Sequence, residues 1–146
     1  MTTKQFAIFL GGIVPGLLLG FPAIFQKLGG AAGIGTGPFL IGVGLTTALV
    51  GGAFILGERE ALWTTPGLLY TALFAVFWAT AIGCVSIALR RYGGQISQLV
   101  PLYNLNTLVT VLIGLFALAE WRTVNAPKLI LAAVLIILGG VLAARA

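Results

Sequence analysis

Polar side chains recur at helical spacing within one otherwise apolar stretch, residues 99–119. Plotted at about 100° per residue, one narrow face carries Tyr103, Asn106, Thr107, Thr110 and Gly114. Asn and Thr are costly against lipid, so this stripe predicts a face turned toward protein or a water-filled cavity. In a cavity these groups would hydrogen-bond a small solute. The alternative is that they hydrogen-bond to neighbouring helices and hold a bundle together.

Further candidate residues lie beside this stripe and on residues 67–89. Asn104 lies on a neighbouring face, where it could cap a kink after Pro101. Trp78 is far from both ends of its apolar segment, which favours an aromatic cavity wall over an interfacial belt. The remaining polar candidates on that segment are Thr80, Cys84 and Ser86, with Cys84 interpreted as a small packing residue.

The residue types that most enzymes need are missing. The chain has no His, no Asp and a single Cys, which excludes zinc sites, Ser-His-Asp triads and disulfides within the chain. We therefore expect no enzyme activity, no cofactor and no metal. The only acids are Glu58, Glu60 and Glu120, all at predicted helix ends, where surface salt bridges are their ordinary role. A proton-coupled antiporter usually needs a titrating group inside the membrane, and none is present.

The elements that must position these side chains are transmembrane helices. The chain has 146 residues, of which 60% are hydrophobic and 8% charged, a balance that excludes a water-soluble fold. The net charge of +5 comes from Lys and Arg scattered between apolar runs, so we expect no nucleic-acid binding. We predict one all-α domain over residues 1–146, with spans at about 6–25, 38–56, 67–89, 99–119 and 126–144.

Prolines and small residues mark where these helices could bend or approach one another. Three prolines fall inside or near the ends of spans, and we treat them as candidate gating positions: Pro15, Pro22 and Pro101. For Pro22, the alternative is that it marks the end of the first helix. Small residues four apart predict close helix packing along two ridges, formed by Gly12, Gly16, Gly20 and by Gly44, Ala48, Gly52, with Gly140 and Ala144 on the last helix. The glycine-rich stretch 33–37 is interpreted as a flexible connector.

The positive charges do not favour one orientation in the membrane. Five spans put the termini on opposite sides, so one side carries Lys4, Arg59, Arg122 and Lys128, and the other carries Lys27, Arg90, Arg91 and Arg145. Because an excess of Lys and Arg on the cytoplasmic side normally sets orientation, this balance favours insertion both ways up. A chain that inserts both ways can pair with an inverted copy of itself and form the inverted repeat of alternating-access transporters.

Three segments carry a resemblance to a known family. Residues 16–27 resemble the opening helix of the EamA-like domain in the drug/metabolite transporter superfamily. Residues 100–122, from Val100-Pro101-Leu102-Tyr103-Asn104 to Leu118-Ala119-Glu120-Trp121-Arg122, resemble its fourth helix and the acidic turn after it, and residues 138–142 are similar to its fifth. The resemblance covers essentially the whole chain through the order and spacing of apolar patterns.

The resemblance implies a half-size transporter. Typical members contain two such five-helix units in inverted orientation, so this chain implies an antiparallel homodimer or a heterodimer with a related half-size chain. The expected function is transport of a small metabolite in the cytoplasmic (inner) membrane of a bacterium or archaeon. The four-helix small multidrug resistance relatives carry a Glu in the first helix, which this chain lacks. Two alternatives stay open: a non-transporting membrane subunit, or a lipid flippase component that works with a partner chain.

Overall fold

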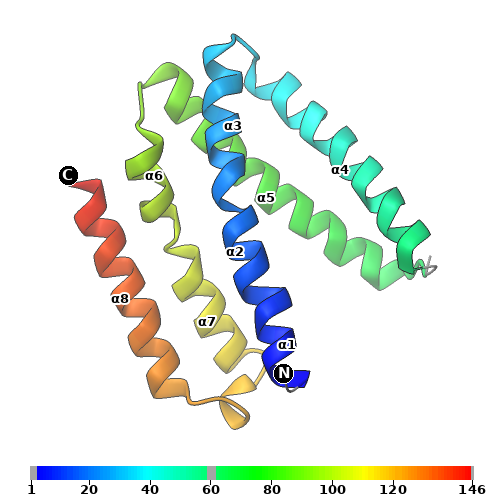
Figure 1. Cartoon of the computed structure of the whole chain (residues 1–146), viewed down its shortest axis with the longest axis vertical. Coiled ribbons are helices and arrows are strands. Elements are labelled where there is room, and N and C mark those ends of the chain that lie inside the picture. The colour runs from blue at the N-terminus through cyan, green and yellow to red at the C-terminus, as the bar shows by residue number, and fades with distance from the viewer. Residues whose placement is uncertain (1–2, 59–61, 146) are drawn as a thin grey trace. The chain divides into compact units, whose positions relative to one another are not determined.

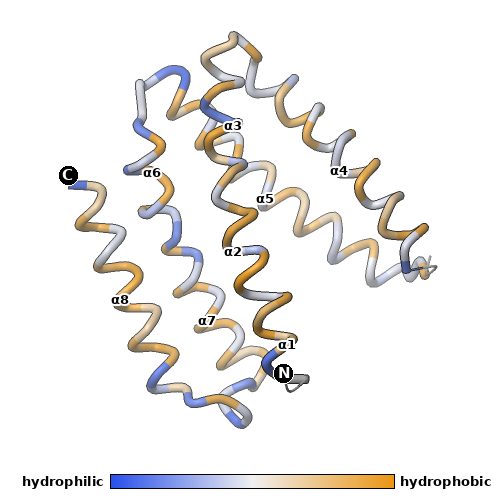
Figure 2. Tube along the Cα trace, viewed as in Figure 1, coloured by the Kyte–Doolittle hydropathy of each residue, from blue (hydrophilic) through white to orange (hydrophobic). Residues whose placement is uncertain are grey.

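The structure is a computed structural model that describes residues 3–58 and 62–145, in which every regular element is a helix (Figure 1). Five helical segments are long and apolar enough to span a membrane: Gln5–Ala31, Thr36–Glu58, Thr65–Arg91, Ile96–Phe116 and Ala126–Ala144. This confirms the prediction of an all-α chain with five candidate transmembrane helices. Figure 2 shows apolar residues along the helices and polar residues gathered mainly at their ends. Arg59 and Glu60, which entered the charge analysis, lie outside the described residues.

The described helices group into two compact units, unit 1 up to Gly93 and unit 2 from Gly94 onward. Unit 1 contains the first three spans, and unit 2 contains the last two. The prediction that residues 1–146 form a single domain depends on how these two units assemble, and it stays a prediction.

The first span of unit 1 is a helix interrupted twice by proline. Its parts are α1 (Thr3–Ile8), the π-helix η1 (Phe9–Ile13), α2 (Val14–Leu18) and α3 (Gly20–Ala31). Pro15 has no N–H, so the regular hydrogen-bond ladder cannot continue through it, and Val14 N–H bonds to Phe9 O, five residues back. Pro22 likewise has no N–H to bond back to the carbonyl of Leu18, four residues earlier, and the chain turns at Leu19.

The predicted end of the first helix at Phe25 is wrong, because α3 continues to Ala31. The polar pair Gln26-Lys27 looked like the start of a loop, but Gln26 is buried against α5. Gly33, two residues beyond the end of α3, stops the helix with a φ of 92°, which suits glycine. There Gly33 N–H bonds to Gly30 O and Ile34 N–H bonds to Gly29 O, which satisfies the last carbonyls of α3.

The second and third spans form a helical pair, α4 (Thr36–Glu58) and α5 (Thr65–Arg91), and α3 also packs on α5. The α5 N-terminus is capped by Thr64, whose Oγ1 accepts a hydrogen bond from Gly67 N at 3.2 Å. Arg90 and Arg91 belong to the last turn of α5, although the sequence placed them in a connection. Basic side chains there interact favourably with the negative end of the helix dipole and stabilise the two additional residues of the helix.

Unit 2 contains α6 (Ile96–Tyr103), α7 (Asn106–Phe116), the short 3-10 helix η2 (Glu120–Arg122) and α8 (Ala126–Ala144). The fourth span is therefore two helices, where the sequence analysis expected one helix from Leu99 to Ala119. The chain turns after α7 at Ala119, whose φ is 56°. It then returns as α8, which packs on both α6 and α7 (Figure 1). The bounds of α8 match the prediction at both ends.

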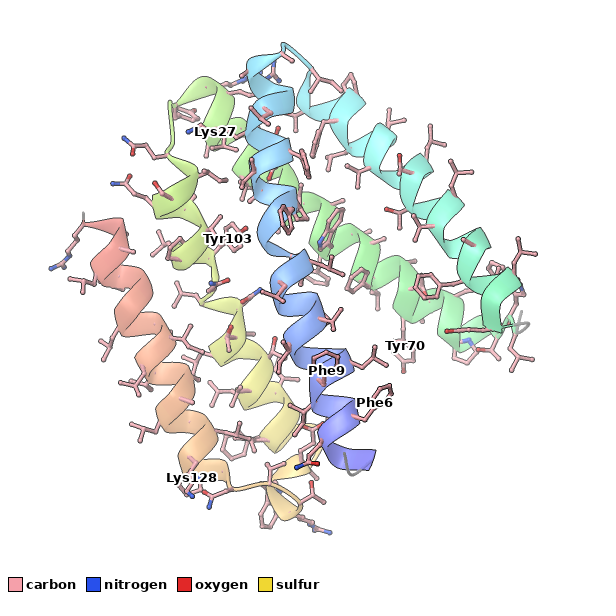
Figure 3. All side chains as sticks on the ribbon, in the orientation of Figure 1. Phe6, Phe9, Lys27, Tyr70, Tyr103 and Lys128 are labelled. Carbon is pink, nitrogen blue, oxygen red and sulfur yellow. The ribbon has the colours of Figure 1, made fainter. Side chains whose placement is uncertain are left out.

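Very little of the apolar surface is covered within the chain. Among the described residues, the buried apolar side chains are Ala23, Leu115 and Ala133, and all three are small or contact a neighbouring helix closely. At most 11% of the most apolar window of any span is buried. Large side chains on every span are exposed, and Figure 3 shows Phe6 and Phe9 projecting away from the first helix. Lipid or another protein chain must therefore cover most of these faces.

Candidate functional site

The break in the fourth span lies at the middle of that span. The span covers 21 residues from Ile96 to Phe116, and the two non-helical residues, Asn104 and Leu105, stand next to its central residue Asn106. Figure 2 shows that polar residues interrupt the apolar run at this break. Backbone groups at a break in mid-membrane need partners from protein, water or a solute, because lipid supplies none.

The backbone geometry of the break follows from Pro101 and from α8. The Leu105 N–H bonds to Leu102 O at 3.2 Å, so it does not continue the α-helical ladder back to Pro101 O. Pro101 O instead faces Gly140 of α8, which is buried. A Cβ built on Gly140 would overlap this oxygen and lie 3.1 Å from the Pro101 carbonyl carbon. Gly140 therefore brings α8 against the carbonyl that the break has freed, with a Cα hydrogen directed at the oxygen.

The polar side chains predicted for the site surround this break in unit 2. Asn104 closes α6 through its backbone, since its N–H bonds to Val100 O and its carbonyl accepts from Thr107 N–H at 2.9 Å. Its side chain makes no hydrogen bond to the described residues, so the capping predicted for it is performed by the main chain. Figure 3 shows Tyr103 at the end of α6, beside the break.

The predicted polar face is only partly continuous. Asn106, Thr107 and Thr110 lie together on the first turns of α7, but the break separates them from Tyr103 on α6. Asn106 Oδ1 accepts a hydrogen bond of 3.4 Å from the Thr107 hydroxyl, and within the described residues the Asn106 amide nitrogen donates to no group. Gly114 is buried, and a Cβ built on it would lie 3.0 Å from Glu120 Oε2. The predicted polar face is therefore covered at Gly114.

Trp78 belongs to unit 1. It stands at the midpoint of the third span, Thr65–Arg91, and 42% of its surface is exposed. The buried residues of α5, Gly83 and Ser86, lie nearer the C-terminal end of the helix than Trp78 does. A role for Trp78 as a stacking wall stays a prediction. Cys84 is a free, exposed cysteine.

The candidate gating prolines all lie at irregular points inside spans. Pro15 follows the π-helical turn, and Pro22 follows the turn at Leu19, near the middle of the first span. The alternative interpretation of Pro22, as the mark of a helix end, is wrong because α3 continues for nine residues beyond it, to Ala31. Pro101 is inside α6, two residues before its end. The gating role of these positions stays a prediction.

The two predicted packing ridges lie open within unit 1. A Cβ built on each of their glycines meets no described atom of that unit within 4 Å: Gly12, Gly16, Gly20, Gly44 and Gly52. Ala48, the remaining member, is exposed as well. These faces are therefore free for contact with a second chain or with lipid, and close packing along them stays a prediction.

Two polar contacts join the spans of unit 1 in pairs, and sequence reasoning missed the one made by Gln26. Gln26 is only 6% exposed, and its Nε2 donates to Ile82 O of α5 at 2.9 Å. Ser86 is 4% exposed, and its Oγ is 3.3 Å from Thr36 Oγ1 of α4. A signal was present in the sequence, since Ala23 and Gly30 place small residues one turn on either side of Gln26 and allow a close helix contact.

The side chains beside the fourth-span break are suited to hydrogen bonding. The groups beside the fourth-span break are amides, hydroxyls and freed main-chain carbonyls, which donate and accept hydrogen bonds without changing charge. Among the described residues, no cluster of His, Cys, Asp or Glu could hold a metal ion. Comparisons of the chain with protein-family models, with curated proteins and with solved structures found no match.

Proposed function

We propose that this chain is a half-size, EamA-like transporter that moves a small neutral metabolite across the cytoplasmic membrane of a bacterium or archaeon. The observation that carries the proposal is the group of polar side chains at the central break of the fourth span. The Asn104 side chain and the Asn106 amide nitrogen have no hydrogen-bond partner among the described residues. A polar group left without a partner in hydrocarbon costs several kcal/mol, on the order of 2–7. A water-filled path or a bound solute removes that cost.

A second observation supports a partner chain. The spans leave nearly all of their apolar surface uncovered, and the glycine ridges of unit 1 meet nothing within that unit. An inverted copy of the same chain would cover such faces and place two fourth spans around one cavity. Five crossings would put the two termini on opposite sides, and the balanced positive charges would allow both orientations. The assembly in this proposal is an antiparallel homodimer. A heterodimer with a related half-size chain would form the same arrangement.

In this proposal the fourth span supplies the contacts to the solute. Asn106, Thr107 and Thr110 present hydrogen-bonding groups from the start of α7, and Tyr103 and Asn104 present theirs from the end of α6. Trp78 would supply an aromatic surface from the third span. The irregular turns beside Pro15 and Pro22 would let the N-terminal half of the first span move, while α3 stays fixed on α5 through Gln26.

Flux through proteoliposomes tests the proposal. Purified protein is reconstituted and assayed with a panel of radiolabelled neutral amino acids, sugars and nucleosides. Asn106→Ala should lower the initial rate of the transported solute about ten-fold, because a lost hydrogen bond in a desolvated site costs about 1–2 kcal/mol. The matched control is Thr46→Ala, which removes a span hydroxyl that bonds to its own helix, to Gly42 O at 2.9 Å, and should leave the rate unchanged.

Two results would count against the proposal. Unchanged flux in a correctly folded Asn106→Ala variant would reject the fourth-span site. Absence of protein-dependent flux for every solute in the panel, together with a second chain that co-purifies, would favour the non-transporting subunit. Comparing the circular dichroism and the size-exclusion profile of each variant with those of the wild type establishes that the variant is folded.

A further inference from the structure

Among the described residues, one end of unit 1 carries three cations and no acid. Arg90 and Arg91 form the last turn of α5, and Lys27 lies on α3 at the same end of unit 1 (Figure 3). All three side chains are exposed. The only described carboxylate of unit 1 is Glu58, at the opposite end of the 23-residue α4, about 33 Å from Thr36 at about 1.5 Å per residue. No described acid of unit 1 can therefore neutralise this end.

The Arg90 side chain is held close to α3. A Cβ built on Gly30 would lie 3.1 Å from Arg90 Cγ and 3.5 Å from Cδ, so the aliphatic stem crosses the helix at this glycine. Its Nη1 lies 4.0 Å from a Cβ built on Gly35, which places the guanidinium beside the turn between α3 and α4. The long stem covers apolar surface while the charged group stays at the end of the span.

Lys27 lies next to this crossing point. It is three residues before Gly30 on α3, and residues three apart are neighbours on a helix surface, with Cβ atoms about 5–6 Å apart. Like charges that lie near one another repel, and an anion bound between them offsets this repulsion. At the end of membrane-spanning helices, the anion at high local concentration is the phosphate of a lipid headgroup.

We propose that Arg90, Lys27 and Arg91 form a binding site for the phosphate group of an anionic phospholipid. Arg90 supplies paired N–H donors suited to a phosphate, Lys27 adds a compact charge beside it, and Arg91 contributes to the local field. The acyl chains of the lipid would lie along the exposed apolar faces of α3 and α5. This site does not depend on the transport function, because it concerns only the end of unit 1.

Lipid titration of the full-length wild-type protein by native mass spectrometry tests the proposal. The probes are phosphatidylglycerol, which is anionic, and phosphatidylcholine, which has no net charge, each added to detergent-solubilised protein. We expect phosphatidylglycerol to bind in preference to phosphatidylcholine. Arg90→Gln should weaken phosphatidylglycerol binding about five-fold, which corresponds to about 1 kcal/mol per cation. Lys27→Gln is a second variant with the same expectation, for use if Arg90→Gln does not fold.

The chain offers a matched control in Arg122. This arginine is also exposed, but its guanidinium lies 5.4 Å from the centre of the Trp121 ring, and Glu120 is two residues away. Arg122→Gln removes the same charge and should leave phosphatidylglycerol binding unchanged. Equal losses in Arg122→Gln and Arg90→Gln would overturn the proposal, because net charge alone would then explain the binding. Full competition by excess inorganic phosphate would also overturn it, since the site would then serve a soluble anion.

Discussion

Replacing Gly140 with alanine is expected to disturb the break in the fourth span. Gly140 is buried in α8, and a Cβ at this position would overlap Pro101 O and lie 3.1 Å from the Pro101 carbonyl carbon. The obstructing atoms belong to the backbone of α6, so they cannot rotate away as a flexible side chain could. Either α8 must move off α6, or the freed carbonyl must reorient.

Gly139, the neighbouring glycine, provides the control from which the expected loss of unfolding free energy is derived. A Cβ on Gly139 meets no described atom within 4 Å, so Gly139→Ala adds only the helix preference of alanine, about 0.5–1 kcal/mol in favour of the folded state. Gly140→Ala gains the same preference but also incurs an overpacking cost of about 1–3 kcal/mol. The preference cancels between the two variants. The free energy of unfolding of Gly140→Ala should therefore be about 1–3 kcal/mol below that of Gly139→Ala.

The assay is reversible unfolding of each variant in mixed micelles, with sodium dodecyl sulfate as the denaturant and helical circular dichroism as the signal. A lower midpoint for Gly140→Ala, with Gly139→Ala at or above the wild type, is the expected result. Equal stability of the two alanine variants would refute the close approach of α8 to the Pro101 carbonyl, and with it the account of how the break is held.

Two further predictions concern unit 1. Gln26→Leu keeps the side-chain size but removes the 2.9 Å hydrogen bond to Ile82 O, so the same unfolding assay should show a loss of about 0.5–1.5 kcal/mol; an unchanged midpoint would show that this buried contact adds no stability. Pro22→Ala restores an N–H that can bond back to the carbonyl of Leu18, so α2 and α3 should merge into one helix and the amides around Leu19 should exchange hydrogen more slowly. Exchange at the wild-type rate would show that something other than Pro22 holds the turn.

The helices could be predicted where local signals were sufficient. The bounds of α8 follow from the apolar run that starts at Leu129 and from Asn125, whose Oδ1 accepts a hydrogen bond from Lys128 N at 3.2 Å and caps the helix. The extension of α3 past Phe25 could not be read in the same way. There the helix is continued by a buried contact between Gln26 and α5, and these groups are 56 residues apart in the sequence.

The candidate site shows the same division between local and distant causes. Asn106, Thr107 and Thr110 share one face of α7 because their spacing is regular within one helix. Tyr103 was assigned to that face on the assumption of a continuous helix, and the break at Asn104 separates it. Pro101 indicated a bend near the start of the span. The turn lies three residues later, where α8 packs against the Pro101 carbonyl through Gly140.

The most direct test of the inverted dimer is the side of the membrane on which the N-terminus lies. A single cysteine is introduced by Thr2→Cys in a Cys84→Ala background, which removes the only native thiol. A membrane-impermeant thiol reagent is applied first to intact cells and then to opened ones. If both orientations are present, about half of the molecules should be labelled on intact cells. The remaining half should be labelled only after the cells are opened. Labelling from one side alone would contradict the antiparallel homodimer and would require a different partner chain.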